Sequence, residues 1–239
     1  MSGMNTAPYQ AWAKETLGYE FKDVDLLVTA FTHRSYVNEH RKSARQHNER
    51  LEFLGDAVLE LVVTSFLFQK YTEPEGILTA WRSALVRTES ICEAGEELGY
   101  DALLRMSKGE RAGSESARKH IVANAFEALI GAVYLEKGYK GAEKIINARI
   151  ISKIDEILAT GSWRDPKSYL QELSQKHDDQ TPDYKVLEEE GPDHDKQFTV
   201  GVYVRDKKIG SGVGPSKQKA QSAAAEQGIM WYNKEHGQN

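Results

Sequence analysis

The stretch Asn48-Glu-Arg-Leu-Glu-Phe-Leu-Gly-Asp-Ala-Val-Leu59 is the most informative part of this chain. Successive residues of an α-helix are rotated by about 100°, which places the carboxylates of Glu49, Glu52 and Asp56 within roughly 60° of one another. The opposite face holds the aliphatic residues Leu51, Leu54, Val58 and Leu61. The stretch therefore predicts a helix that buries an aliphatic face and aligns three carboxylates on the other side.

Aligned carboxylates repel one another, by roughly 1 kcal/mol or more per pair near a protein surface. A divalent cation removes this conflict, and oxygen ligands of this kind suit Mg²⁺. The alternative is that the acids form only the solvated face of an amphipathic helix. Glu60 also projects from the acidic side, so helical geometry alone does not decide between the two. Gly55 would permit the close approach of another backbone.

A second segment, His120–Gly131, has the same character. Its predicted buried face holds the apolar residues Val122, Phe126, Leu129 and Val133. Asn124 and Glu127, spaced i and i+3, project from the other side. If the two helices face each other, their oxygen ligands form a cage for one or two cations. Such a site activates water and stabilises charge on phosphate during in-line displacement. The pairing itself is a hypothesis from the pattern.

Apolar periodicity predicts a helical N-terminal region. The predicted helices cover residues 23–31, 50–71, 79–98, 119–137 and 142–158. Thr160-Gly-Ser162 then resembles a linker, and Pro166 is suited to the first turn of a short helix. We therefore expect an all-α domain over residues 1–159 and a linker over 160–164.

The composition changes beyond the linker. Phe198–Val204 alternates apolar and polar residues with period two, as a half-buried strand does. Asp206–Lys208 is predicted to turn into a second strand, Ile209–Val213, and Pro215 to open an alanine-rich helix. The sequence therefore predicts a small α+β domain over residues 165–235.

Composition restricts the class of protein. The chain has 239 residues, of which 40% are hydrophobic and 28% charged, as in ordinary globular proteins. Its longest uninterrupted apolar run, Ala128–Leu135, is far too short to cross a membrane. Cys92 is the only cysteine, which excludes an internal disulfide and fits a reducing cytosol. Because no secretory signal is apparent in Met1–Ala13, a cytoplasmic protein without membrane contact is expected.

The motifs resemble those of bacterial ribonuclease III. Asn48–Val58 reads NERLEFLGDAV, which is similar to the signature of that family. Further matches are Thr32-His-Arg-Ser35, Leu85-Val-Arg87 and Glu127-Ala-Leu-Ile-Gly131. The resemblance implies that residues 1–159 form the family's helical catalytic and dimerisation domain.

The resemblance also implies roles for individual residues. Metal ligands are expected at Glu52, Asp56, Asn124 and Glu127, of which Asp56 and Glu127 match the residues designated catalytic. Glu49 and Glu75 match auxiliary acids of the family. The expected cofactor is Mg²⁺, for which Mn²⁺ can substitute.

Asn124 departs from the aspartate common at its position. Its amide oxygen can still coordinate Mg²⁺, but the site loses one negative charge. The change is either a tolerated variant or one that weakens activity, which leaves a non-cleaving or attenuated duplex-RNA-binding regulator as the alternative. A purely structural ribosome-associated protein is a third possibility, but it gives the aligned carboxylates no evident use.

The C-terminal region resembles a double-stranded-RNA-binding domain of α–β–β–β–α order. One face of its first helix presents Ser168, Gln171 and Glu172, groups that suit the 2′-hydroxyls of an A-form minor groove. Gly191-Pro-Asp-His194 resembles the loop that enters a second minor groove in that domain family, with His194 at its tip. A second-helix N-terminus would direct its free N–H groups, with Ser216, Lys217 and Lys219, at phosphate.

The resemblance implies a homodimeric, Mg²⁺-dependent endoribonuclease that cuts double-stranded RNA to 5′-phosphate and 3′-hydroxyl ends. Expected substrates are ribosomal RNA precursors and structured messenger and transfer RNA transcripts.

The net charge of −5 is an average over an uneven distribution. Residues 196–219 hold six basic residues and one acid, whereas residues 178–195 hold eight acids and one lysine. The charge therefore excludes a nonspecific polybasic binder. It does not exclude an enzyme that holds RNA through a small basic patch and metal ions.

Overall fold

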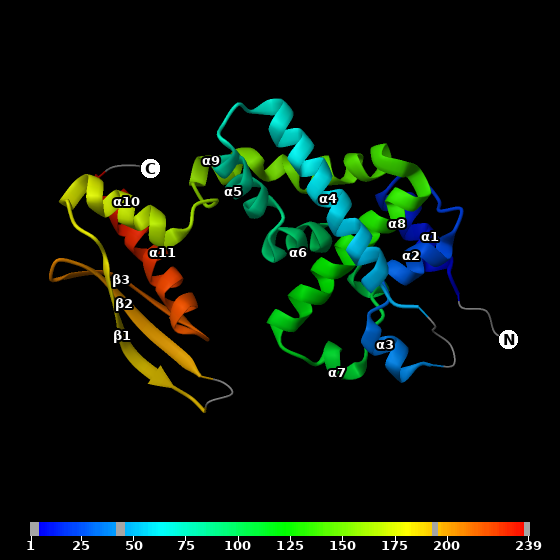
Figure 1. The fold of residues 1–239 in the computed structure, drawn as a ribbon. Helices are drawn as coiled ribbons and strands as arrows, with labels where there is room; N and C mark the ends of the chain where they lie inside the picture. Colours follow the sequence, from blue (N-terminus) through cyan, green and yellow to red (C-terminus); the bar gives the residue numbers. More distant parts are fainter. Residues whose placement is uncertain (1–4, 42–45, 193–195, 237–239) are drawn as a thin grey trace. The chain divides into compact units, whose positions relative to one another are not determined.

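The computed structural model describes residues 5–41, 46–192 and 196–236, and the chain divides into two compact units, Met1–Thr160 and Gly161–Asn239 (Figure 1). The helices of the first unit are α1 (Ala7–Thr16), α2 (Val24–Ala30), α3 (Arg34–Glu39), α4 (Glu49–Lys70), α5 (Glu75–Leu85), α6 (Thr88–Glu97), α7 (Lys108–Arg111), α8 (Glu115–Arg149) and α9 (Ile154–Thr160). Short 3₁₀ turns cover Asp101–Leu103 and Ile151–Lys153.

The second unit has the order α10 (Pro166–Asp178), β1 (Asp183–Glu190), β2 (Gln197–Val204), β3 (Lys207–Gly214) and α11 (Lys217–His236). An all-α unit followed by an α–β–β–β–α unit confirms the predicted fold class. No helix of the described residues is both long and apolar enough to cross a membrane.

Helix α8 is the centre of the first unit. Residues 121–133 of this helix are buried on almost every side, and the predicted buried residues Val122, Phe126, Leu129 and Val133 are all at most 2% exposed. The helix kinks at Gly138, where φ is 69°. Because neighbouring elements surround residues 121–133, the two polar side chains in this stretch, Asn124 and Glu127, are held in fixed surroundings.

Helix α4 packs along α8 and buries Leu51, Val58, Leu59, Val62, Val63 and Leu67. The predicted aliphatic face was wrong at Leu61, which is 56% exposed. The buried face is rotated toward Leu59 and Val62, because α4 meets α8 through Gly55. Phe53 and Phe68 are exposed together with Leu61, so α4 also carries an uncovered apolar surface.

Two predicted helical segments have different boundaries in the structure. Residues 79–98 form parts of two helices, α5 and α6, because Arg87 is extended and the Ser90 hydroxyl donates to the Ala84 carbonyl. The latter contact satisfies a carbonyl at the end of α5 without a glycine or proline to mark the break. The segment 142–158 begins inside α8, which ends at Arg149, and continues through the 3₁₀ turn Ile151–Lys153 into α9.

The second unit places both helices against an antiparallel sheet of order β1-β2-β3. Helix α11 lies directly on β3, where Cβ atoms added at Gly210, Gly212 and Gly214 would collide with α11 near Ala220 and Ala224. The alanine-rich sequence of α11 thus matches the glycines of β3, which let the helix approach the strand closely. The core is completed by Leu170, Leu173, Val200, Val202, Val204, Ile209 and Tyr232.

The second unit differs from two local predictions. The β2–β3 turn is Arg205-Asp206 rather than Asp206–Lys208, since Lys207 already pairs with Val204. Helix α11 begins at Lys217 rather than at Pro215. In the predicted linker, Arg164 packs over the ring of Tyr169 at 4.4 Å, so this end of the segment folds with α10.

Candidate active site and RNA-binding surface

The first candidate site lies where α4 crosses α8. A Cβ atom at Gly55 would overlap the backbone carbonyl of Glu127, and a Cβ atom at Gly131 would overlap the carbonyl of Leu51. The two helices therefore touch backbone to backbone at two glycines. This contact puts the turns of α4 and α8 that carry the predicted ligands beside each other.

The four predicted metal ligands are neighbours in the structure. Burial, together with the charges of Asp56 and Glu52, raises the pKa of Glu127 to about 7. Burial and the charge of Glu49 raise the pKa of Glu52, whereas a hydrogen bond with Asn124 opposes this shift. A carboxylate accepts in such a bond, so the Asn124 amide donates to Glu52. Three carboxylates thus share one partly buried region with an amide.

The donor set fits a hard divalent cation, because it consists of oxygen atoms in a region of excess negative charge. Within residues 5–41, 46–192 and 196–236, however, no three His, Cys, Asp or Glu side chains converge closely enough to hold a metal ion. The carboxylates are therefore grouped without forming a closed cage, and the amide of Asn124 occupies one position in the group.

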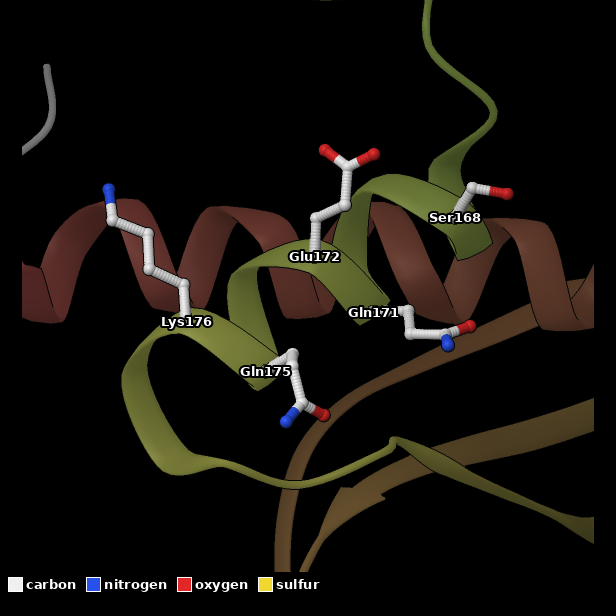
Figure 2. A pocket seen from close by; sticks show the side chains of 5 residues that line it. All are labelled: Ser168, Gln171, Glu172, Gln175 and Lys176. Atoms are coloured by element: carbon white, nitrogen blue, oxygen red, sulfur yellow. The ribbon is translucent and has the colours of Figure 1, made fainter.

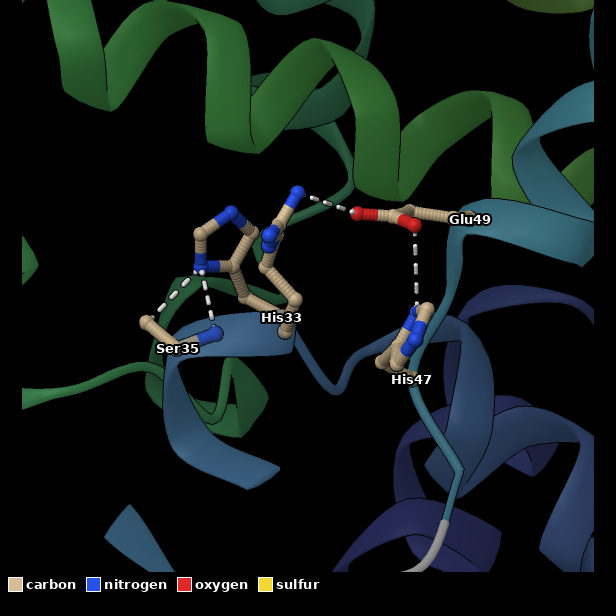
Figure 3. Close-up of polar contacts among 5 residues, drawn as sticks. His33, Ser35, His47 and Glu49 are labelled. Carbon is tan, nitrogen blue, oxygen red and sulfur yellow. Dashed lines mark hydrogen bonds and ion pairs between the residues drawn. The ribbon is translucent and has the colours of Figure 1, made fainter. Parts of the chain in front are cut away.

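Glu49 lies at the start of α4, on the same acidic side, and is held by basic neighbours (Figure 3). Its carboxylate lies 3.3 Å from Arg34 Nη1 and 3.7 Å from His47 Nδ1. His33 has a structural role, because its Nδ1 accepts from the backbone N–H of Ser35 and caps α3. These contacts fix the chain that leads into α4.

Within one chain, Glu75 lies apart from the side chains grouped at the crossing of α4 and α8. It begins α5, where its carboxylate accepts from the Thr79 hydroxyl at 3.2 Å. It lines a groove between α4 and α5 together with Phe68 and Arg82. The structure thus brings five of the six predicted acidic-site residues into one region and leaves Glu75 in another.

The second candidate site is the exposed face of α10 (Figure 2). The predicted residues Ser168, Gln171 and Glu172 line one shallow groove with Gln175 and Lys176. Gln175 and Lys176 were not predicted from the sequence, although positions i+7 and i+8 from Ser168 continue the same helical face. Asp165 caps α10 by accepting from both the backbone N–H and the hydroxyl of Ser168 at 2.9 Å.

The start of α11 forms the other part of this surface. The Ser216 hydroxyl accepts from the backbone N–H of Lys219, as an N-cap does. Lys217 Nζ lies 2.8 Å from Glu189 on β1, and Lys217 lowers the pKa of Glu189. A predicted phosphate-binding lysine is therefore paired with an acid of the same unit. The predicted contact His194 lies outside the described residues.

A helical unit that groups acidic side chains, followed by an α–β–β–β–α unit with a polar helix face, fits the class of nucleases that carry an RNA-binding domain. Residues 23–154 match the family model described as Ribonuclease-III-like, and residues 166–231 match the model of the double-stranded RNA binding motif.

Curated relatives agree with these matches. The chain is 46% identical over 210 residues to Ribonuclease 3 of Protochlamydia amoebophila, covering 87% of this chain and 86% of the relative. It is 43% identical to Ribonuclease 3 of Oceanobacillus iheyensis over 220 residues, or 90% and 95% of the two chains. This chain belongs to the ribonuclease III family of endonucleases.

A solved structure supports the fold of the first unit. The nuclease domain of ribonuclease III from Campylobacter jejuni, described as flexible in a region involved in dimer formation, is 38% identical to this chain. It matches with a TM-score of 0.52 and covers 59% of this chain and 97% of that one. Members of the family generally depend on a divalent metal.

Proposed function

We propose that this protein is a Mg²⁺-dependent endoribonuclease that cleaves double-stranded RNA to 5′-phosphate and 3′-hydroxyl ends. The observation that carries the proposal is the crossing of α4 and α8 at Gly55 and Gly131, which groups Glu52, Asp56 and Glu127. The RNA-binding unit on the same chain supplies the substrate class.

The ligands of Mg²⁺, or of Mn²⁺ as a substitute, are Glu52, Asp56, Asn124 and Glu127 in this proposal. When bound, the cation activates water and stabilises the charge that develops on the scissile phosphate. Asp56 and Glu127 are the catalytic pair. Asn124 orients Glu52 by its hydrogen bond, and Glu49 and Glu75 act as auxiliary acids.

RNA recognition uses shape rather than base sequence. The polar face of α10, with Ser168, Gln171 and Glu172, faces the 2′-hydroxyls of a minor groove, because these groups are short donors and acceptors. Ser216, Lys217 and Lys219 at the start of α11 contact phosphate. His194 adds a contact in a second minor groove. The substrates are ribosomal RNA precursors and structured messenger and transfer RNA transcripts, processed in the cytoplasm.

The active form is a homodimer in which each subunit contributes one cleavage site. The exposed apolar side chains Phe53, Leu61 and Phe68 on α4 support this, since water-exposed apolar surface of this kind marks an interface. The related Campylobacter jejuni nuclease domain is described as having a region involved in dimer formation.

A duplex-RNA-binding regulator with weak or no cleavage is the second candidate. The observation in its favour is Asn124, whose amide donates to Glu52 where a carboxylate would add charge to the site. The other three acids are retained, which is why we prefer the enzyme.

Long duplex RNA incubated with and without Mg²⁺ tests the proposal. Short products that form only with the metal are expected, and end labelling will show 5′-phosphates. A gel shift without products in Mg²⁺ and in Mn²⁺ would instead establish the regulator.

A further inference from the structure

The first unit contains a second groove, away from the grouped carboxylates. It lies between the end of α1 and the second half of α8 and has a volume of about 390 Å³, within the range of small-ligand sites. Four basic side chains line it, and no acidic side chain does: Lys137, Lys140, Lys144 and Arg149. A groove whose charged side chains are all positive is unexpected in a chain whose net charge is −5.

Two of these cations are not neutralised by the protein. Lys140 and Lys144 are exposed, stand at i and i+4 on one helix face, and form no ion pair with the described residues. Like charges at this spacing destabilise a helix. Lys137 and Arg149 are partly offset, since Lys137 lies 3.9 Å from Glu136 and Arg149 lies 3.5 Å from Glu97. The groove is therefore complementary to an anion.

The wall of the groove is apolar. Leu17, Leu98, Ile145 and Ala148 contribute to it, and Leu98 is only 4% exposed. None of these residues is among the large apolar side chains that protrude from the described surface. Insertion into a membrane surface requires protruding apolar groups. A recessed apolar wall beside cations instead fits a ligand that combines a flat ring with phosphate groups.

We propose that this groove binds single-stranded RNA, with phosphates on Lys140 and Lys144 and a base against Leu17 and Ile145. Sites for single-stranded nucleic acid combine a cationic track with apolar surface for unstacked bases, whereas a duplex keeps its base faces covered. The inference rests on the proposed function, in which RNA is the substrate. It extends recognition from the duplex to the single-stranded segments beside it.

The test is fluorescence anisotropy of a labelled oligouridylate with the full-length protein in metal-free buffer. The charge-reversal pair Lys140→Glu/Lys144→Glu is compared with Lys108→Glu/Lys234→Glu, which changes net charge equally outside the groove. We expect the first pair to weaken binding by about tenfold at low salt and the second to change it much less. The milder Lys140→Gln/Lys144→Gln pair keeps the test valid if charge reversal disturbs folding.

A second readout compares a blunt duplex with a duplex that carries a single-stranded extension. The extension should strengthen binding to the unaltered protein, and this gain should disappear in the Lys140/Lys144 pair. Equal losses in the groove and control pairs would overturn the proposal. The proposal would also be overturned if the Lys140→Glu/Lys144→Glu variant lost binding to anionic phosphatidylserine vesicles but still bound oligouridylate. Cleavage of the blunt duplex, measured on the same samples, reports separately on the proposed function.

Discussion

The two candidate sites are built in opposite ways. The acidic site depends on buried backbone contact at Gly55 and Gly131 and leaves its carboxylates close to one another. The RNA surface consists of exposed side chains on helix faces, and one of its lysines, Lys217, is paired with Glu189 of the same unit. The first site thus needs a cation from outside, whereas the second must exchange internal partners for RNA. Changes in the first should have larger effects.

The largest effect is expected at the helix crossing. Gly131→Leu would drive a side chain into the Leu51 carbonyl and separate α4 from α8. Overpacking costs typically 1–3 kcal/mol, and about that or more is expected here because the obstacle is backbone. Thermal unfolding followed by circular dichroism should show a clear loss of stability together with loss of activity. Gly76→Ala is the control, since a Cβ atom there meets nothing within 4 Å. Equal stability of both variants would show that the crossing tolerates separation.

A smaller effect is expected at the RNA surface. Lys217→Ala/Lys219→Ala should weaken duplex binding by about tenfold at low salt, because phosphate contacts dominate affinity there. The loss should shrink as salt rises, and the slope of log affinity against log salt should fall by about one per lysine. Anisotropy titrations over a salt series measure this. A loss that is independent of salt would exclude a phosphate contact.

Asn124→Asp tests how far the acidic site depends on outside charge. The new carboxylate removes the amide donor to Glu52 and adds repulsion. We expect lower thermal stability without metal and a lower Mg²⁺ concentration for half-maximal cleavage, by about a few-fold. An unchanged metal titration would mean that charge at this position is unimportant.

The smallest effect is expected from releasing an internal partner. Glu189→Gln removes the acid paired with Lys217 and leaves this lysine free to contact phosphate. Because an exposed ion pair contributes little, duplex binding should become only about threefold stronger. Glu235→Gln, an exposed acid near the end of α11, controls for the change in net charge. Equal gains in both variants would attribute the effect to net charge rather than to the pair.

Helical periodicity was sufficient to predict which side chains share a face. It placed Glu49, Glu52 and Asp56 together, and it placed Asn124 with Glu127. It could not show that the two helices touch, because that contact is made by backbone at Gly55 and Gly131 rather than by a repeating side-chain pattern. The predicted buried face of α4 was wrong at Leu61 for the same reason.

Other features had weak local patterns. Strand β1 is exposed at almost every position, so it lacks the alternation that identified β2, and only the family resemblance indicated it. The break between α5 and α6 depends on a side-chain contact of Ser90 with Ala84 rather than on a breaking residue. Gln175 and Lys176 could have been predicted, since they continue the spacing of Ser168, Gln171 and Glu172.

We propose that the side chains grouped at the crossing of α4 and α8 perform metal-dependent cleavage. The most direct measurement is the rate of duplex-RNA cleavage in Mg²⁺ by Glu127→Gln, compared with Glu60→Gln, an acid of α4 outside the group. We predict a loss of about a hundredfold or more for Glu127→Gln, since several kcal/mol of transition-state stabilisation depend on the ligand set. Glu60→Gln should cleave at nearly the original rate. Similar rates for both variants would show that Glu127 is not part of the cleavage site.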